Sequence, residues 1–127
     1  MKAVKHFREL DVYKLAFEYA MEIFEISKKF PSEEKFSLTD QIRRSSRSVC
    51  SNIAESWRKR RYKLSFVNKL NDAMSEACET QSWLDFCLAS KYITNEVFNR
   101  LDSKYELIIN KLNGMELKAD SFCFIST

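Results

Sequence analysis

The chain has 127 residues, of which 45% are hydrophobic and 31% charged, with a formal net charge of +3. This length suits one globular domain with its own core, and the hydrophobic content argues against a disordered protein. There is one Gly and one Pro. Because turns and hairpins use these two residues heavily, the composition argues against an all-β or α/β fold and predicts an all-α fold with short connections.

The first predicted helix covers residues 12–29. Its apolar residues recur at spacings of three and four, the period of a helix with a buried face. A second apolar stripe makes this helix apolar over more than one face. Asp11 is a good N-cap residue, and Pro31 ends the helix because its ring cannot continue the backbone hydrogen bonds.

The second predicted helix covers residues 38–58. Ser37 and Asp40 at its start are typical of a capping box, in which Ser37 caps a free backbone amide and Asp40 reaches back to the start of the helix. Small residues, among them Ser45 and Ser46, flank the apolar stripe. They indicate a close approach to a neighbouring helix.

The third predicted helix covers residues 63–90, where apolar and small residues alternate at four- and three-residue spacing. This seam suits near-parallel packing. The fourth helix covers residues 95–113, with Thr94 as its N-cap and Gly114 just after its end. Residues 116–127 have no helical period and are expected to form a flexible C-terminal tail. Its apolar residues are candidates for docking on a partner: Phe122, Phe124 and Ile125.

Four amphipathic helices joined by short links predict an antiparallel up-down-up-down four-helix bundle formed by residues 1–115. The first and third helices carry more apolar surface than one bundle core requires. Surplus apolar area on a small protein usually marks an interface, so we expect self-association, with a wide core as the alternative. The candidate interface residues are Phe17, Phe24, Trp83 and Phe86.

Residues 43–63 contain eight basic side chains against a single acid, Glu55, whereas the rest of the chain has more acidic than basic residues. At about 100° per residue, the arginines of the second helix fall opposite its apolar side, with serines interleaved. The basic residues that follow are expected at one end of the bundle. The candidate phosphate-binding residues are Arg43, Arg44, Arg47, Arg58, Lys59, Arg60, Arg61 and Lys63.

Two interpretations of this basic block remain open. Arginine forks bind phosphate through two hydrogen bonds, and serine hydroxyls add contacts, so the block is a candidate nucleic-acid interface. The alternative is a solvated surface, or ion pairs with the carboxylates of the third helix, within one chain or between copies. Those carboxylates belong to Asp72, Glu76 and Glu79.

Few residues here are suited to catalysis or cofactor binding. His6 is the only histidine, and no GxGxxG loop, P-loop or Glu-x-x-His motif occurs. The four cysteines include no CxxC pair, which argues against zinc and for a reducing compartment. We therefore expect no enzymatic activity, no metal and no cofactor. Without a long apolar run or an apolar leader, a cytoplasmic location is expected, with no membrane contact.

Three segments together resemble a known family: FRELDVYKLA, then ISKKFPSEEKFSLTDQIRRSSRSVCSNIAESWRKRRY, then EACETQSWLDF. In this order they resemble, over residues 7–113, the four-helix-bundle proteins encoded by intervening sequences of bacterial 23S ribosomal RNA genes. Ser56 stands where this family commonly has Gly, and the loop RKRRYK looks longer than usual. The matching positions are Arg43 and Arg44 after Gln41, Asn52 and Glu55 in NIAE, and Glu79, Thr80 and Gln81 in ETQ.

The resemblance implies a four-helix bundle that assembles into a ring-like homopentamer. The family is similar to the accessory protein of diversity-generating retroelements, a basic pentamer that binds nucleic acid and a reverse transcriptase. Two hypotheses follow. In the first, the protein is a non-enzymatic, homo-oligomeric bundle that binds nucleic acid, with RNA expected, through phosphate contacts. In the second, it is a protein assembly scaffold or a reverse-transcriptase accessory protein whose arginines are structural.

Overall fold

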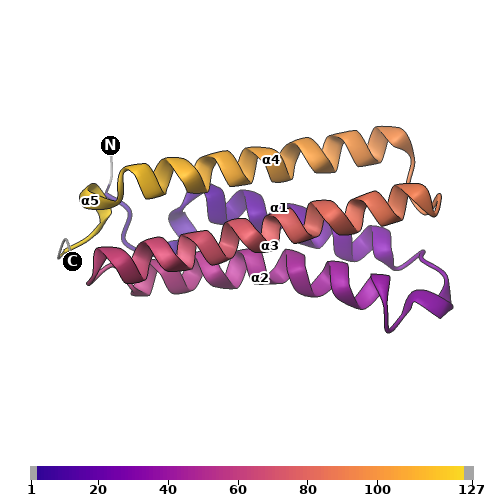
Figure 1. The fold of residues 1–127 in the computed structure, drawn as a ribbon, viewed down its shortest axis with the longest axis horizontal. Coiled ribbons are helices and arrows are strands. Elements are labelled where there is room, and N and C mark those ends of the chain that lie inside the picture. The colour runs from indigo at the N-terminus through magenta and orange to yellow at the C-terminus, as the bar shows by residue number, and fades with distance from the viewer. Residues whose placement is uncertain (1–2, 125–127) are drawn as a thin grey trace.

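The computed structural model describes residues 3–124, and this part of the chain is helical with no β-strand (Figure 1). Four long helices account for most of it: α1 (Asp11–Ser27), α2 (Leu38–Arg58), α3 (Lys63–Ala89) and α4 (Asn95–Leu117). Three single-turn elements complete it: η1 (Phe7–Glu9), η2 (Ser32–Glu34) and α5 (Ala119–Phe122). The predicted all-α class is confirmed.

Each long helix packs against two others, α1 and α3 both lying against α2 and α4. Consecutive helices run in opposite directions, as Figure 1 shows. The α1–α2 and α3–α4 connections lie at one end of the bundle, and the α2–α3 connection lies at the other end with α5. The long helices therefore form an antiparallel four-helix bundle.

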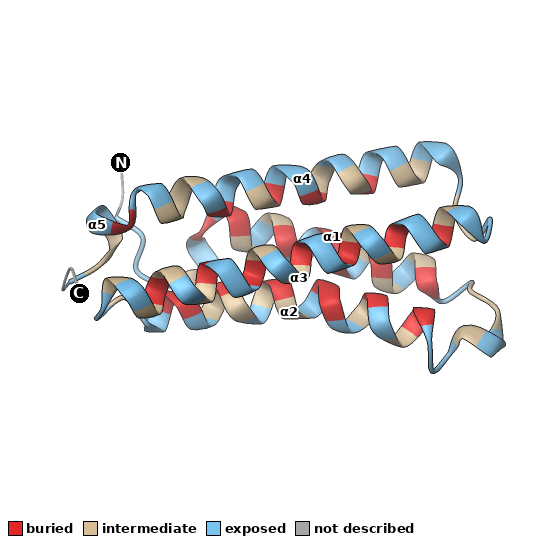
Figure 2. Cartoon of the chain, in the orientation of Figure 1, coloured by how far each residue is buried: buried red, intermediate tan, exposed pale blue. Residues whose placement is uncertain are grey.

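The core follows the apolar period of each helix, and the buried positions face the bundle axis (Figure 2). On α3 the buried residues keep the predicted alternation of four- and three-residue spacing. Fully burying one large apolar side chain contributes about 1.5–3 kcal/mol, so each large residue of this seam adds measurably to the stability of the bundle. The buried residues of α3 are Phe66, Leu70, Ala73, Ala77, Thr80, Leu84 and Cys87.

Of the three predicted N-cap residues, Ser37 and Thr94 hold the N-cap position and Asp11 does not, and only Thr94 caps through its side chain. Asp11 is the first residue of α1 and not its N-cap, which is Leu10. Its carboxylate still lies in the first turn, where it interacts favourably with the helix dipole. The N-cap at Thr94 is confirmed, since its Oγ1 accepts a hydrogen bond from the Val97 amide at 3.1 Å.

The capping box predicted for α2 is wrong. The hydroxyl of Ser37 donates to Glu34 Oε1 at 2.6 Å, and the side chain of Asp40 pairs with Arg44 at 2.9 Å. The carboxylate of Glu34 replaces the box, because it accepts a hydrogen bond from the amide of Leu38 at 3.4 Å. Glu34 lies in η2, so the cap comes from the connection that precedes the helix.

The predicted end of the fourth helix at Gly114 is also wrong. The helix continues through this residue to Leu117, and Gly114 does not take a positive φ. Residues 116–122 are mostly helical, so the predicted flexible tail is wrong for this segment. Phe122 of α5 packs between the rings of Trp57 and Phe66, with centroids 6.2 Å and 5.7 Å away. Ile125 lies outside the described residues.

Candidate nucleic-acid interface

The predicted basic block divides into two surfaces along α2. The first, here called the basic groove, has a volume of about 510 Å³. The second, here called the end patch, is the basic run at the α2–α3 connection, Arg58 to Lys63. Arg47 and Arg58 are eleven residues apart on one helix, a separation of about 17 Å. The groove is lined by Lys35, Phe36, Thr39, Asp40, Arg43, Arg44, Arg47 and Ser48.

Two arginines of the basic groove pack over an aromatic ring of α1. The guanidinium carbons of Arg43 and Arg47 lie 4.8 Å and 5.4 Å from the ring centroid of Phe24. Arg43 also donates through Nε to Ser27 Oγ at 2.7 Å and is partly buried. Arg43 therefore ties α2 to α1, whereas Arg47 is exposed and keeps its hydrogen-bond donors toward solvent.

The third arginine of the groove forms an exposed ion pair. Arg44 Nε lies 2.9 Å from Asp40 Oδ2, one helical turn away. Such surface pairs contribute only about 0–1 kcal/mol, so a phosphate can compete with Asp40 for the guanidinium. Four basic side chains thus face one carboxylate in the basic groove.

The end patch contains one arginine with a structural role. The guanidinium carbon of Arg60 lies 3.6 Å from the ring centroid of Trp57 and 5.1 Å from that of Phe124. Its Nε donates to the carbonyl of Trp57 at 2.8 Å, and burial lowers the pKa of the Arg60 guanidinium. Lys63 is also engaged, in an ion pair with Asp120 at 3.1 Å.

The other basic side chains of the end patch project into solvent. Arg58, Lys59 and Arg61 are exposed and form no ion pair with any residue in the range 3–124. The guanidinium of Arg61 lies 5.6 Å from the ring of Tyr62, itself an exposed aromatic side chain. The end patch therefore combines unpaired cations with an accessible ring.

The carboxylates of α3 do not neutralise this block within residues 3–124 of the chain. Asp72 lies 3.8 Å from Lys69, which pairs at 2.8 Å with Glu55. Glu79 accepts a hydrogen bond from Trp83 Nε1 at 3.3 Å. The pKa of Glu76 is raised by burial and by its two acidic neighbours on α3. Intramolecular pairing of these acids with the arginines of α2 does not occur among the described residues.

The four aromatic residues predicted for self-association do not form one surface, although two of them, Trp83 and Phe86, are in contact. Phe17 on α1 is 52% exposed and Phe86 on α3 is 55% exposed, each beside its own shallow groove. Trp83 is partly buried and stacks on Phe86 at 5.7 Å. Phe24 is covered by arginines, as described above, and is not an open surface.

One exposed aromatic residue was missed by sequence reasoning. Phe36, in the connection between η2 and α2, is 86% exposed and lines the basic groove. The signal was present in the sequence: this bulky apolar residue stands outside both helical periods, between Lys35 and Ser37. An apolar residue outside the helical period is not predicted to be buried in the core, so it is a candidate for a role on the surface.

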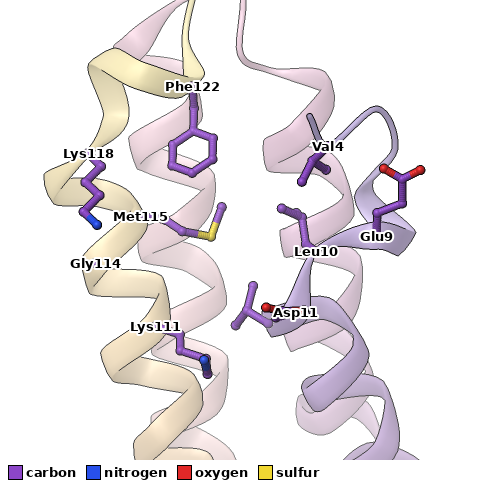
Figure 3. A pocket seen from close by; sticks show the side chains of 10 residues that line it. Val4, Glu9, Leu10, Asp11, Lys111, Gly114, Met115, Lys118 and Phe122 are labelled. Carbon is purple, nitrogen blue, oxygen red and sulfur yellow. The ribbon is translucent and has the colours of Figure 1, made fainter. Parts of the chain in front are cut away.

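A second cavity, of about 430 Å³, lies at the end of the bundle where α4 and α5 meet the start of α1 (Figure 3). Leu10, Met115 and Phe122 give it an apolar wall, and Asp11 and Lys111 supply opposite charges. Its two acidic and two basic residues balance in charge, whereas the basic groove has four cations against one carboxylate.

Within the part of the chain that the structure describes, no cluster of three or more His, Cys, Asp and Glu side chains is arranged to hold a metal ion. Burial raises the pKa of the Cys50 thiol to about 11 and that of Cys87 to about 12. Both thiols are therefore protonated at neutral pH and are poor nucleophiles. Among the described helices, none is both long and apolar enough to cross a membrane.

The fold defines the class of protein: a small all-α, antiparallel four-helix bundle, here with a cation-rich second helix. The sequence model of the family described as 23S rRNA-intervening sequence protein matches residues 8–114, and the chain belongs to this family. The family resemblance seen in the sequence is thus confirmed. No curated protein matches the chain.

A solved structure with the same fold is a protein of unknown function from the S23 ribosomal protein family of Bacteroides thetaiotaomicron VPI-5482. The two chains are 31% identical, and the match covers 83% of this chain and 94% of the other, with a TM-score of 0.74. The similarity therefore extends over nearly the whole of that protein.

Proposed function

We propose that the protein is a non-enzymatic, homo-oligomeric bundle that binds nucleic acid, with RNA as the expected form, through its basic groove and end patch. The observation that carries this proposal is a set of exposed cations along α2 and its C-terminal connection with no ion pair inside residues 3–124. Closely spaced unpaired cations attract a polyanion and release its counterions. These residues are Arg47, Arg58, Lys59 and Arg61.

The eight candidate residues divide into three roles in this proposal. The four unpaired cations contact phosphates directly. Arg44 and Lys63 exchange their exposed carboxylate partners for phosphate when the ligand binds. Arg43 and Arg60 have structural roles: Arg43 ties α2 to α1 through Phe24, and Arg60 packs on Trp57 and Phe124 at the end of the bundle. Such contacts read the backbone and its shape and carry little base specificity.

Fluorescence anisotropy with a labelled RNA, titrated at several salt concentrations, tests this function. With phosphate contacts from all six of these cations, the logarithm of the association constant should fall against the logarithm of salt concentration with a slope of about −4 to −5. The double variant R47E/R58E removes two of the six contacts, so it should bind far more weakly and reduce the magnitude of this slope by about a third. The matched control is K91E/K111E, which changes the net charge equally at exposed positions on other elements.

Two results would contradict the proposal. The first is an absence of binding even at low salt. The second is an equal loss of affinity in R47E/R58E and in K91E/K111E, because net charge alone would then account for the attraction. Labelled DNA of the same sequence, measured in parallel, decides between RNA and DNA.

Self-association forms the other half of this proposal, with the ring-like homopentamer of the resemblance as the expected assembly. Phe17 lies on α1 and Phe86 on α3, helices at opposite corners of the bundle, and both rings are about half exposed. A contact between two unlike faces joins copies head to tail, which closes into a ring when the rotation permits. Size-exclusion chromatography with light scattering measures the mass. A monomer at high concentration, or an assembly unchanged in F17E/F86E, would refute this part.

The second candidate function is a protein scaffold, such as an accessory protein of a reverse transcriptase, in which the arginines are structural. It is favoured by the packing of Arg43 and Arg60 on aromatic rings. In this case R43E should dissociate the oligomer or unfold the chain, and RNA should not bind. An intact oligomer in R43E removes this candidate. The reverse transcriptase itself stays a prediction.

A further inference from the structure

The phenyl ring of Phe36 is an unusual surface feature. It is 86% exposed and lies beside the basic groove rather than in the core. The Nζ of Lys35 lies 5.3 Å from the ring centroid, so a cation already accompanies the ring. Contiguous exposed apolar surface often marks an interaction site, and Phe36 also borders a groove lined by Trp83 and Phe86.

The backbone around Phe36 is fixed by hydrogen bonds on both sides. Glu34 accepts bonds from the hydroxyl of Ser37 at 2.6 Å and from the hydroxyl of Tyr92 at 2.8 Å. The carbonyl of Glu34 also accepts from the amide of Ser37 at 3.0 Å. Since Tyr92 belongs to the α3–α4 connection, this short segment is anchored to two parts of the bundle. Phe36 is therefore presented to solvent by an ordered connection.

The groove beside the ring has the dimensions of a short nucleotide segment. Two rows of residues at four-residue spacing form its floor, and from Thr39 to Ser48 it extends about 13 Å along α2. This length corresponds to about three or four stacked nucleotides at about 3.4 Å each. Its volume of about 510 Å³ lies in the range typical of small-ligand sites, about 300–1,000 Å³. The rows are Thr39–Arg43–Arg47 and Asp40–Arg44–Ser48.

We propose that the basic groove binds an unpaired, single-stranded stretch of nucleic acid, with Phe36 stacked on one base and Arg44 and Arg47 on the neighbouring phosphates. This inference rests on the proposed function and specifies its ligand. A base inside a duplex has both faces covered, so an exposed ring gains nothing from it. An unpaired base offers a free face, and aromatic stacking together with backbone cations is how proteins hold single strands.

The test uses the full-length protein and labelled oligonucleotides of about 12 nucleotides, within the usual site size of single-strand binding folds. Single-stranded RNA, single-stranded DNA and a perfectly paired RNA hairpin are compared at one salt concentration. The variants are F36A, F36W and the control L117A. Leu117 is matched because it is 80% exposed and is the last residue of α4. This end of α4 lies beside α5, at the opposite end of the bundle from the α1–α2 connection that carries Phe36 (Figure 1).

The single strands should bind more tightly than the hairpin. F36A should weaken single-strand binding by about 5- to 100-fold, the usual effect of removing one stacked aromatic residue, and should leave hairpin binding unchanged. F36W keeps a stacking surface and should restore the affinity, whereas L117A should have no effect. The comparison of RNA with DNA shows whether the ribose hydroxyl contributes.

Three outcomes would overturn this inference. A preference for the hairpin, or an F36A variant that binds single strands like wild type, would refute single-strand recognition while the proposed function survives. A change of oligomeric mass in F36A would assign Phe36 to a contact between copies, since this ring also borders the groove of Trp83 and Phe86. If no nucleic acid binds at low salt, the proposed function fails and this inference with it.

Discussion

Arg58 and Arg60 stand two residues apart in one basic run, yet the structure gives them different roles, and replacing each by alanine separates these roles. Arg58 is exposed, whereas Arg60 is partly buried between two aromatic rings and donates a hydrogen bond to a backbone carbonyl. A cation over an aromatic ring contributes about 0.5–2 kcal/mol, and a hydrogen bond from a charged group about 1.5–3 kcal/mol. Because Arg60 is only partly desolvated, R60A should lower the free energy of unfolding by about 1–2 kcal/mol.

Urea unfolding followed by far-UV circular dichroism measures this difference. With an m-value of about 2 kcal/mol/M, R60A should lower the midpoint by about 0.5–1 M urea, and R58A should leave it unchanged. Nucleic-acid affinity should show the reverse order, with R58A losing more than R60A. Equal midpoints for the two variants would refute the packing role of Arg60. A larger loss of affinity in R60A would instead place that guanidinium at the phosphate surface.

Three further predictions concern stability. G114A should raise the free energy of unfolding by about 0.5–1 kcal/mol, because the position is helical and a Cβ there meets nothing within 4 Å; an unchanged or lowered melting temperature would contradict this. T80V should lower it by about 1 kcal/mol, because it removes the buried 2.8 Å contact between the hydroxyls of Thr80 and Ser45; the urea midpoint measures this, with the S75A surface variant as control. Hydrogen bonds from Ser37 and Tyr92 hold the pKa of Glu34 below its usual value of 4.5, so its contribution to stability is present above pH 4.5 and is lost as the pH falls through the lowered pKa. E34Q should therefore be less stable than wild type at neutral pH, and thermal melts should show this gap closing as the pH falls below 4.5.

Most of the fold follows from local patterns in the sequence. The second helix has its predicted bounds, 38–58, and the third ends one residue earlier than predicted. Both helices have a regular apolar spacing over more than five turns, and such a long pattern defines which side of the helix is buried. The errors lie at helix ends, where several residues compete for the same backbone amides. Ser37 was a reasonable cap, but Glu34 binds its hydroxyl. Gly114 is typical of a helix end, but α4 continues through it because side chains on both sides of it pack on the core: Leu112 is buried and Met115 packs against the buried cluster.

The sequence predicts which side of α2 its arginines occupy, but it does not predict which of them pack against aromatic rings. The angular position of each arginine on α2 follows from the helical period, and Arg44, Arg47 and Arg58 are indeed exposed. The packing of Arg43 and Arg60 depends on rings from distant parts of the chain, so it requires the tertiary structure. Phe24 comes from α1, and Phe124 follows α5. Spacing along one helix cannot show which cations such rings will cover.

The uninterrupted course of α2 makes it a rigid spacer between two cationic surfaces. A straight helix cannot shorten, so a ligand that bridges the basic groove and the end patch must span about 17 Å, roughly five stacked nucleotides. Shorter oligonucleotides reach one surface at a time and gain nothing from the other. The affinity of this protein for oligonucleotides should consequently increase abruptly once their length allows them to reach both surfaces. A helix break engineered near Asn52 should make this increase more gradual.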